Sequence, residues 1–373
     1  MGEFDIGFLG GGQLARMSIQ AAQRMGLRCV SLDPQSDSPA SKIAASVVGN
    51  LHDPNLIAEI FRRSSRVTLE NEFIPSDAII EATAIAKESP EKLLPGVECL
   101  ATIQDKLLQR LAYAAHCVPS PTAVQLTEET SKSLSYPCVL KARFGGYDGK
   151  GTITARSEAD VIASQSRWLD GSWLAEEFVP FKRELAVMVF RTPSVSGTFP
   201  TVETVQTDHV CDLVFPSGVD ASEVAIAAVE AVGGFGLFGV ELFELENGDL
   251  VVNEIAPRPH NTGHYTLDWG ATSQFEQHIR LVSGLAIGST DGRAVCMANL
   301  LGQPNAGDYR YGISSTLTDS CVRFHWYGKS ESRPGRKMGH LNVVGPMTFE
   351  PNGEMLQAAV RARTRFYEAW TRP

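Results

Sequence analysis

The first hundred residues alternate between short apolar runs and longer stretches in which apolar residues recur every three or four positions. The short runs predict β-strands and the longer stretches predict helices. In chain order, these elements fall at 4–9, 13–25, 28–32, 55–63, 66–69 and 76–87. Strands and helices in alternation at this spacing are typical of βαβ units, which build a parallel sheet. We therefore expect an α/β, Rossmann-like domain over residues 1–100.

The pattern changes after this domain. A helix is predicted at 102–116, and the prolines of segment 118–121 then interrupt the chain as a linker would. Two short strands, a helix and a third strand follow, at 138–142, 153–155, near 158–169 and at 173–178. This mixture, with a glycine-rich loop between the first two strands, predicts a small α+β module within residues 101–182.

Strands dominate the last part of the chain, residues 183–373. The predicted elements are strands at 183–190 and 201–207, a helix at 221–232, an apolar hairpin at 237–255 and a helix near 272–283. Further strands and a basic stretch at 329–340 follow. The sequence contains no internal repeat and no low-complexity tract.

Composition limits the class of protein. With 373 residues, of which 43% are hydrophobic, the chain can form two or three domains with cores of their own. It carries 43 Asp+Glu against 33 Lys+Arg, a net charge of −10, which argues against a nucleic-acid-binding protein with a basic surface. No apolar run approaches the ~18 residues of a membrane span. We therefore expect neither nucleic acid nor membrane as a partner.

The chain runs from Met1 straight into a predicted strand, so no signal peptide is expected. Seven cysteines are dispersed along the chain, without a Cys-x-x-Cys pair. An odd number of scattered cysteines is typical of reduced thiols rather than of a disulfide framework or a zinc site. Together these features predict a cytoplasmic location.

Glycines 10 to 12 lie between the first strand and the first helix, in the order Gly-x-Gly-x-x-Ala, and Asp33 ends the next strand. This is close to the fingerprint of dinucleotide-binding domains, where the turn lets the phosphates approach a helix N-terminus. Many α/β domains use the same turn for other phosphates or for packing. A dinucleotide-dependent oxidoreductase therefore remains an alternative at this point.

A second glycine-rich loop follows Lys141, in the sequence VLKARFGGYDGKG at 139–151. Such a loop exposes backbone N–H groups, and Lys141 and Lys150 add positive charge, which suits a polyphosphate. It is not a Walker loop, because no Gly-Lys-Ser/Thr opens a helix. The alternative is a flexible hairpin with solvated lysines.

The segment FGVELFELENGDLVVNEIAP predicts a β-hairpin that turns at Asn247-Gly248. A two-residue turn there would pair Glu246 with Asp249 and, further along, Glu241 with Glu254. Directly opposite residues have Cβ atoms ~4.5–5.5 Å apart, so the two carboxylates would repel unless a cation lies between them. Oxygen-only ligands suit Mg²⁺ bound to substrate phosphates. The alternative is a bulge that separates the two side chains, or a solvated sheet face.

Seven segments, in this order, resemble the ATP-grasp superfamily and, within it, the 5-(carboxyamino)imidazole ribonucleotide synthases. They are GGGQLARM at 10–17, TLENEF at 68–73, QDK at 104–106, KARFGGYDGKG at 141–151, EEFV at 176–179, NEIAPRPHNTGHYT at 253–266 and HWYGKSESRPGRKMGH at 325–340. The resemblance spans nearly the whole chain. It implies an ATP-grasp fold with a pre-ATP-grasp domain at 1–100, a linker helix and lid at 101–182, and a catalytic domain at 183–373.

The resemblance implies an ADP-forming carbon–nitrogen ligase of purine biosynthesis. Its substrates would be ATP, bicarbonate and aminoimidazole ribonucleotide, and ATP would convert bicarbonate to carboxyphosphate. Phosphorylation gives bicarbonate a leaving group, and that step depends mainly on positioned phosphates and neutralised charge. Mg²⁺, or Mn²⁺ in its place, would be held by Glu241 and Glu254. The family is commonly dimeric, so a homodimer is expected, as is transfer of the product to a downstream mutase.

The same resemblance implies which residues bind ATP. Lys106 and Lys141 would contact the phosphates, the 145–151 loop would cover them, and Glu184 would bind the ribose. The full implied set is Lys106, Lys141, Gly146, Tyr147, Asp148, Gly149, Lys150, Gly151, Glu176, Glu177, Phe178, Val179, Glu184, Gln206, Asn253 and Glu254. The family usually has a histidine where Gln206 stands, so this contact is a departure.

The implied residues for the imidazole nucleotide come from all parts of the chain. They are Gln13, Glu72, Arg258, His264, Lys329, Arg336 and Lys337, the last three as the basic cluster for its 5′-phosphate. The candidate catalytic residues are Tyr147, Asp148, Lys150 and His264, of which Asp148 or His264 would move a proton. His260 and His264 also have a zinc-like spacing, but Pro259 and Gly263 disfavour the helix this would need.

Three rival functions remain open on the sequence. A formate-dependent glycinamide ribonucleotide formyltransferase of the same superfamily shares ATP and Mg²⁺, but it typically has Glu where Gln13 stands. A dinucleotide oxidoreductase would leave the Glu241/Glu254 pair without a role. The third rival is a non-catalytic nucleotide sensor with the same fold.

Overall fold

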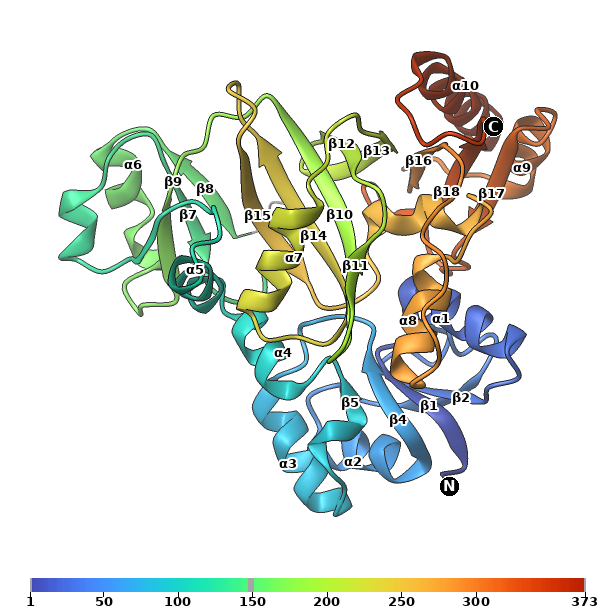
Figure 1. Cartoon of the computed structure of the whole chain (residues 1–373), viewed down its shortest axis with the longest axis horizontal. Helices are drawn as coiled ribbons and strands as arrows, with labels where there is room; N and C mark the ends of the chain where they lie inside the picture. The colour runs from blue at the N-terminus through green and yellow to red at the C-terminus, as the bar shows by residue number, and fades with distance from the viewer. Residues whose placement is uncertain (1, 147–150, 372–373) are drawn as a thin grey trace.

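The computed structural model of the chain describes residues 2–146 and 151–371. Its N-terminal part forms a five-stranded parallel sheet in the order β3-β2-β1-β4-β5 (Figure 1). The strands are β1 (Phe4–Leu9), β2 (Cys29–Asp33), β3 (Ala45–Val48), β4 (Ser64–Leu69) and β5 (Leu93–Leu94). The helices between them are α1 (Gln13–Arg24), α2 (Pro54–Arg63), α3 (Ser76–Ala86) and the 3-10 turn η1 (Pro90–Lys92). The predicted Rossmann-like domain is confirmed, and β3 and β5 are additions to it.

Both faces of this sheet are covered by helices. Successive side chains of a strand point to opposite faces, and β1 accordingly sends Leu9 into a core with α2 and α3. Ile6 and Phe8 enter a second core that contains α1 and also Phe275 of α8 (Gln274–Val282). A helix from the second half of the chain therefore completes the N-terminal domain.

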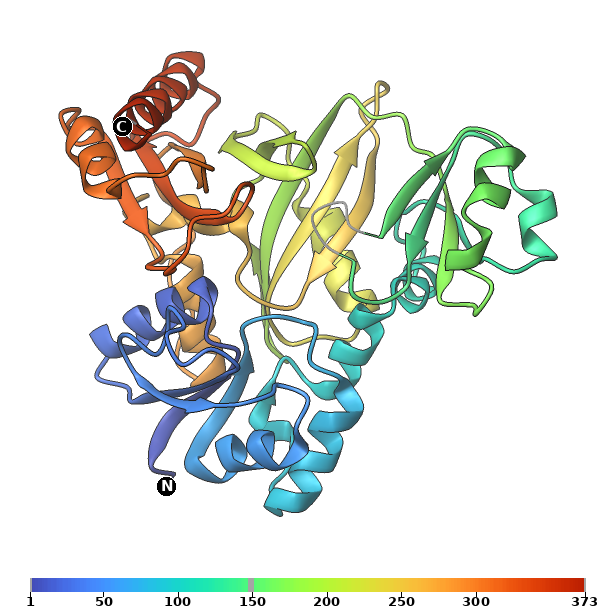
Figure 2. The ribbon, with the colours of Figure 1, turned by 180° about the vertical axis from the view of Figure 1, so that it is seen from behind.

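The predicted helix at 102–116 is wrong as a single element, because two helices meet at Asp105. They are α4 (Val97–Gln104) and α5 (Lys106–Ala115). Asp105 has extended backbone angles, and its carboxylate accepts a hydrogen bond from the N–H of Leu107 at 3.0 Å. It therefore ends one helix and caps the next. Figures 1 and 2 both show the lid sheet at the far end of α5 from the N-terminal sheet.

The lid is a four-stranded sheet in the order β6-β9-β7-β8. Its strands are β6 (Ala123–Gln125), β7 (Cys138–Ala142), β8 (Thr152–Ala155) and β9 (Trp173–Glu177). The helix predicted near 158–169 is shorter: α6 (Glu158–Ala163) stops at Ser164 and the 3-10 turn η3 (Gln165–Arg167) follows. A further 3-10 turn, η2 (Thr130–Ser133), precedes β7. Trp168 and Trp173 are buried in the small core under this sheet.

In the described residues, the rest of the chain forms a nine-stranded sheet in the order β15-β14-β10-β12-β13-β16-β18-β17, with β11 on β10. The strands are β10 (Arg183–Arg191), β11 (Ser196–Thr198), β12 (Val202–Thr207), β13 (Val210–Pro216), β14 (Gly236–Glu244), β15 (Leu250–Ala256), β16 (Val295–Leu301), β17 (Val322–Trp326) and β18 (Lys337–Val344). The helices are α7 (Ser222–Ala231), the 3-10 helix η4 (Asn261–Leu267), α8, α9 (Tyr309–Thr316) and α10 (Gly353–Trp370). Helix α7 packs on β10 and β14, with Ala225 and Val229 in the core.

The sequence analysis names neither α9 nor α10. Helix α10 buries Met355, Ala359, Ala362, Phe366 and Trp370 against β16 and β18. The three sheets lie within residues 4–94, 123–177 and 183–344. The domain boundaries at 100 and 182 stay a prediction. The combination of an α/β part with α+β parts is the one the sequence predicted.

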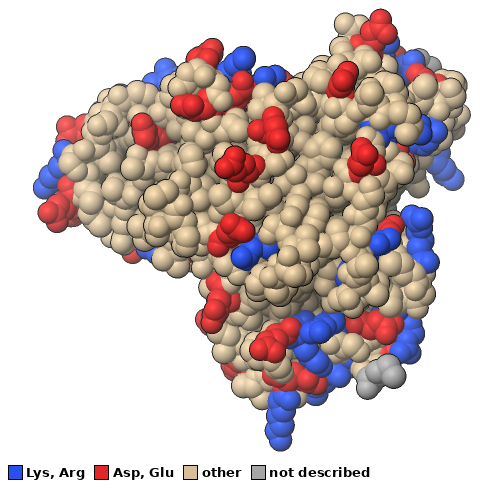
Figure 3. All heavy atoms as spheres, viewed as in Figure 1, with Lys and Arg blue, Asp and Glu red and all other residues tan. Residues whose placement is uncertain are grey.

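Within residues 2–146 and 151–371, no helix has the length and apolar character needed to cross a membrane. Figure 3 shows one face of the molecule, on which acidic side chains spread over the centre while Lys and Arg gather mainly on the N-terminal domain. This face offers no continuous basic surface.

Candidate active site

The lid sheet, the central sheet and the N-terminal domain enclose a cavity of about 540 Å³. Most residues proposed from the sequence line it. Those that do are Gln13, Glu72, Lys141, Glu176, Glu177, Phe178, Val179, Glu184, Gln206, Glu241, Asn253, Glu254, Arg258 and Lys337. Residues proposed for ATP and residues proposed for the imidazole nucleotide thus share one cavity.

Glu241 on β14 and Glu254 on β15 are directly paired, as the sequence predicted. The predicted two-residue turn is wrong, however, because Glu244 pairs with Leu250 and the N–H of Leu245 donates to Asp249 O at 2.9 Å. Pairing therefore starts one residue out of the expected register. A bulge between Leu242 and Glu241 then restores the expected register, so that Glu241 pairs with Glu254. On the sequence, a bulge is the alternative that would separate the two carboxylates. In the structure, the bulge places Glu241 and Glu254 opposite each other.

The two carboxylates have opposite electrostatic environments. Burial raises the pKa of Glu241 to about 8, and the nearby Glu254 and Glu184 add to the rise. Burial also acts on Glu254, but the ammonium of Lys106, 3.1 Å away, and Lys141 outweigh it, so the pKa of Glu254 is lowered. Glu241 therefore holds a proton more readily than Glu254 does.

The donor set of this pair fits a divalent cation of the Mg²⁺ type. Both side chains offer oxygen only, and a cation between them would remove the repulsion that raises the pKa of Glu241. The described residues hold no cluster of three or more His, Cys, Asp or Glu arranged for a metal. Phosphate oxygens and water would therefore have to complete the coordination, as is usual for Mg²⁺.

A buried ion network lies behind the proposed phosphate site. The side chain of Glu176 is 2% exposed and binds Arg110 Nε at 2.8 Å and Lys141 Nζ at 2.7 Å. Burial raises the pKa of Glu176, but the two cations outweigh it and lower the pKa. Lys141, proposed to contact phosphate, is thereby fixed on the lid strand β7. The sequence analysis missed Arg110, although it follows Lys106 by four residues and so shares its helix face.

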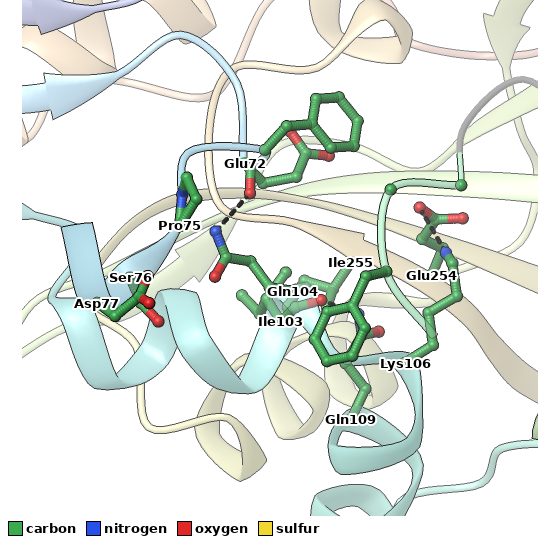
Figure 4. A pocket seen from close by; sticks show the side chains of 14 residues that line it. Glu72, Pro75, Ser76, Asp77, Ile103, Gln104, Lys106, Gln109, Glu254 and Ile255 are labelled. Atoms are coloured by element: carbon green, nitrogen blue, oxygen red, sulfur yellow. Dashed lines mark hydrogen bonds and ion pairs between the residues drawn. The ribbon is translucent and has the colours of Figure 1, made fainter. Parts of the chain in front are cut away.

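A second cavity, of about 410 Å³, adjoins the first (Figure 4). Glu72, Phe73 and Glu254 line both cavities, while Lys106, Gly145 and Gly146 line only this one. Figure 4 shows Lys106 and Glu254 reaching toward each other across its right side. Lys106 therefore reaches Glu254 from the second cavity.

The base of the glycine-rich loop is tied to the joint between α4 and α5. Asp105 is 3% exposed and pairs with Arg143, whose Nε donates at 3.0 Å and whose Nη2 donates at 2.5 Å. The N–H of Lys106 also donates to Arg143 O at 3.0 Å. Tyr147, Asp148, Gly149 and Lys150 lie outside the described residues. On either side of them, the N–H of Ala142 donates to Gly151 O at 2.8 Å. Gly151 follows at once, with φ +78.

The part of the cavity wall proposed for the imidazole nucleotide contains a partly buried ion pair. Arg258 Nε and Nη2 donate to the two oxygens of Glu72, at 2.5 and 2.8 Å, in a bidentate pair between β15 and the end of β4. Gln13 opens α1 beside them in the same cavity. The residues proposed for the imidazole nucleotide thus come from two domains.

Two N–H groups at the N-terminal glycine loop are already bonded to carboxylates of the protein itself. The N–H of Gly11 donates to Asp33 Oδ2 at 2.8 Å, and that of Leu14 to Glu70 Oε1 at 3.4 Å. A Cβ at Gly12 would lie 2.3 Å from Glu70 Oε1. The start of α1, where a pyrophosphate would bind, is occupied by the protein's own carboxylates, which disfavours the oxidoreductase alternative.

Three proposed nucleotide residues lie away from the lining of the larger cavity. His264 is fully buried, and burial lowers its pKa to about 3, whereas His260 lines the cavity. Lys329 Nζ donates to Lys337 O at 2.7 Å, and Arg336 Nη1 donates to Glu331 O at 2.9 Å. Of the basic cluster, Lys337 alone lines the cavity among described residues. His264 forms part of η4, a 3-10 helix, and His260 directly precedes that helix.

Three protein-family models match consecutive parts of the chain. Residues 4–104 match the ribonucleotide synthetase preATP-grasp domain, 110–275 the ATP-grasp domain and 295–350 the phosphoribosylaminoimidazole carboxylase C-terminal domain. An N5-carboxyaminoimidazole ribonucleotide synthase of Synechococcus elongatus is 38% identical over 99% of this chain and 96% of its own. The phosphoribosylaminoimidazole carboxylase of Ogataea methanolica is also 38% identical, but this chain spans only 66% of its length.

A solved structure is similar over the full length. The N5-carboxyaminoimidazole synthase of Aspergillus clavatus, in complex with ADP and 5-aminoimidazole ribonucleotide, is 30% identical. It has a TM-score of 0.85 over 100% of this chain and 99% of its own.

Proposed function

This chain belongs to the N5-carboxyaminoimidazole ribonucleotide synthase family of ATP-grasp proteins, and on that premise we propose that it carboxylates 5-aminoimidazole ribonucleotide at the expense of ATP. The products are 5-(carboxyamino)imidazole ribonucleotide, ADP and phosphate, in the synthesis of purines. One observation carries the proposal: a single cavity contains both the Glu241/Glu254 pair with Lys141 and the Glu72–Arg258 wall with Gln13 and Lys337. A donor and an acceptor of the carboxyl group therefore fit side by side.

The first step transfers the γ-phosphoryl group of ATP to an oxygen of bicarbonate, and ADP leaves. Lys106 and Lys141 supply positive charge at the phosphates, and the backbone edge of 176–179 reads the adenine. Phe181 and Phe243, stacked with ring centroids 4.4 Å apart, add an apolar surface to the same cavity. Glu184, whose pKa is raised by burial, faces the ribose. When bound between Glu241 and Glu254, Mg²⁺ or Mn²⁺ would neutralise the developing phosphate charge.

In the second step the exocyclic amine of the imidazole attacks the carboxyl carbon, or the CO₂ released from carboxyphosphate. Phosphate leaves with the bonding electron pair, and the amine nitrogen loses one proton. Gln13, Glu72, Arg258 and Lys337 orient the nucleotide, with Lys337 toward its 5′-phosphate. Asp148 remains a candidate for the proton transfer. The complete burial of His264 favours a supporting role for that residue.

The test is an ADP-release assay with Mg-ATP and bicarbonate, with and without 5-aminoimidazole ribonucleotide. We expect the nucleotide to stimulate ADP release and to be carboxylated. Absence of stimulation would overturn the proposal. Stimulation by formate with glycinamide ribonucleotide would instead favour the formyltransferase, and NAD binding without ADP release would favour the oxidoreductase. Binding of ATP without any turnover would favour a nucleotide sensor.

The family also leads us to propose a cytoplasmic homodimer that passes its product to a mutase. Light scattering on the purified chain tests the dimer, and a coupled assay with the mutase tests the transfer. A monomer, or a coupled rate equal to that of freely diffusing product, would count against these two points.

A further inference from the structure

Gln274 is the first residue of α8, and its side chain is fully buried, yet it is bonded to the wall of the cavity. Its Oε1 accepts from the N–H of His260 at 2.9 Å, and its Nε2 donates to His260 O at 2.8 Å. The side-chain amide of Gln274 therefore bonds both the backbone N–H and the backbone carbonyl of His260. His260 is the residue of the 258–261 segment that this amide fixes.

The orientation of this amide is determined by its partners. The N–H of His260 can only donate, so Oε1 must face it and Nε2 must face the carbonyl oxygen. The second hydrogen of Nε2 points to His264 Nδ1, 2.8 Å away. If Nε2 of Gln274 donates there, His264 accepts at Nδ1 and carries its own proton on Nε2, which is buried and has no hydrogen-bond partner among the described residues. Burial keeps this imidazole neutral, with a pKa of about 3, so the acceptor is present at any working pH.

The side-chain amide of Gln274 packs closely against Gly263. A Cβ at Gly263 would lie 2.5 Å from Oε1 and 2.7 Å from Cδ. The N–H of Gln274 donates to Thr266 Oγ1 at 2.9 Å, and this hydroxyl donates to Gly263 O at 2.6 Å. The backbone and the side chain of Gln274 are thus both fixed against the turn of η4.

The segment held in this way carries the nucleotide wall. Arg258 and His260 line the large cavity, and Arg258 makes the bidentate pair with Glu72. On its other side, His260 packs against Gly239 of β14. A Cβ added at Gly239 would lie 2.5 Å from the Cβ of His260. The wall is therefore clamped between β14 and the side chain of Gln274.

We propose that Gln274 is a positioning residue of the reaction, whose side-chain amide fixes the backbone of His260 and so the 258–261 wall that binds the imidazole nucleotide. This rests on the proposed function, because the nucleotide is identified by it. Gln274 does not line the cavity, so its effect on the nucleotide must pass through His260 and Arg258.

The chain supplies a matched control on the same helix. Gln277 of α8 is also fully buried, but its Oε1 accepts from the N–H of Gly288 at 2.9 Å, in a loop away from the cavity. Gln274→Met and Gln277→Met remove one buried amide each, at nearly constant volume. A general loss of helix packing would affect both variants alike.

We expect Gln274→Met to raise KM for 5-aminoimidazole ribonucleotide by about tenfold or more, because small displacements of a binding wall have large effects. KM for ATP should stay within about threefold of that of the unaltered chain. Gln277→Met should leave both constants unchanged. An unchanged nucleotide KM in Gln274→Met, or an equal rise in Gln277→Met, would overturn the proposal. If Gln274→Met does not fold, Gln274→Glu, which keeps the bond from the His260 N–H, is measured against the same criteria.

A second measurement separates this inference from the proposed function. In ¹⁵N-labelled protein the His264 ring should be the neutral tautomer protonated at Nε2, and Gln274→Met should lose that preference while Gln277→Met retains it. A ring already protonated at Nδ1 in the unaltered chain would overturn the inference. If the unaltered chain does not respond to the imidazole nucleotide, the proposed function fails, and this spectrum still decides whether Gln274 holds His264 as described.

Discussion

The guanidinium of Arg110 reaches groups on two different sheets. It binds the carboxylate of Glu176 on the lid, and the carbonyl oxygen of Asn253 on the central sheet at 2.7 Å. Because Glu176 also holds Lys141, this one side chain links the helix, the lid and the carboxylate hairpin. Nothing in the sequence marks it, since the contacts depend on the packing of three distant segments.

Replacing Arg110 should destabilise the fold. In Arg110→Met the buried Glu176 keeps only Lys141 as its partner, and breaking a buried pair in this way typically costs about 3–5 kcal/mol. Urea denaturation measures the change. The control is Arg63→Met, which removes exposed pairs to Glu3 and Glu59 and should cost no more than about 1 kcal/mol. Equal losses in both variants would show that Arg110 acts only through surface charge.

Glu254→Gln should abolish turnover while leaving the fold intact. The amide has the same size as the carboxylate, but it cannot provide the negative charge that a divalent cation requires. We expect ADP release to fall by about 10²-fold or more. Circular dichroism checks the fold, and Glu246→Gln in the exposed turn is the control. Near-normal activity in Glu254→Gln would count against the metal role of the pair.

At the scale of elements, the bulge in β15 explains how a partly wrong prediction reached the right pair. The alternation of apolar residues and the Asn247-Gly248 signal predict the hairpin, but the local turn chemistry places pairing one residue off. The bulge beyond Leu242 corrects this offset. Alternation of apolar residues does not reveal a one-residue shift in strand pairing unless the position of the bulge is known.

The joint at Asp105 escaped prediction for a similar reason. Ile103 and Leu107 keep the helical spacing across it, and both are buried, so the apolar pattern reads as one helix. The break depends on the pair between Asp105 and Arg143, 38 residues away. Helix α10 differs, because its apolar residues at 355, 359, 362, 366 and 370 do carry a readable helical period.

Asp105→Ala should therefore affect both stability and ATP binding. It removes a helix N-cap, worth about 1 kcal/mol, and leaves Arg143 without its carboxylate partner at the base of the glycine-rich loop. We expect a loss of stability greater than that of Asp53→Ala, which removes only the N-cap of α2. KM for ATP should rise in Asp105→Ala alone. Equal stability losses and an unchanged KM would show that the joint is an ordinary cap.

At the scale of the whole molecule, several histidines are held neutral by burial. The pKa of His278 is lowered to about 4 and that of His264 to about 3, and the pKa values of His260 and His340 are also lowered. Each such group binds a proton more readily in the unfolded chain, where its pKa is near 6.5. Stability should therefore fall as the pH drops below about 6.5, and the His278 contribution should level off below about 4.

His278→Gln tests this expectation. His278 lies in α8, and its Nε2 is 3.0 Å from Thr68 Oγ1, a contact that Gln can keep. A single titrating group contributes a slope of about 1.4 kcal/mol per pH unit between the two pKa values. The free energy of unfolding of the variant should depend less steeply on pH between about 6.5 and 4 than that of the unaltered chain. Identical slopes would show that the pKa of His278 is not lowered in the folded protein.

Helix α8 also bears on how the chain acquires its structure during synthesis. The inner face of the N-terminal sheet, with Ile6 and Phe8, is closed by Phe275, Ile279 and Val282. Those residues leave the ribosome long after the sheet itself. Helix α1 covers part of this face early, but the part that α8 closes must stay uncovered while the lid and most of the central sheet are made. The order of synthesis and the order of burial do not coincide in this protein, and a chaperone that shields apolar surface would act in that interval.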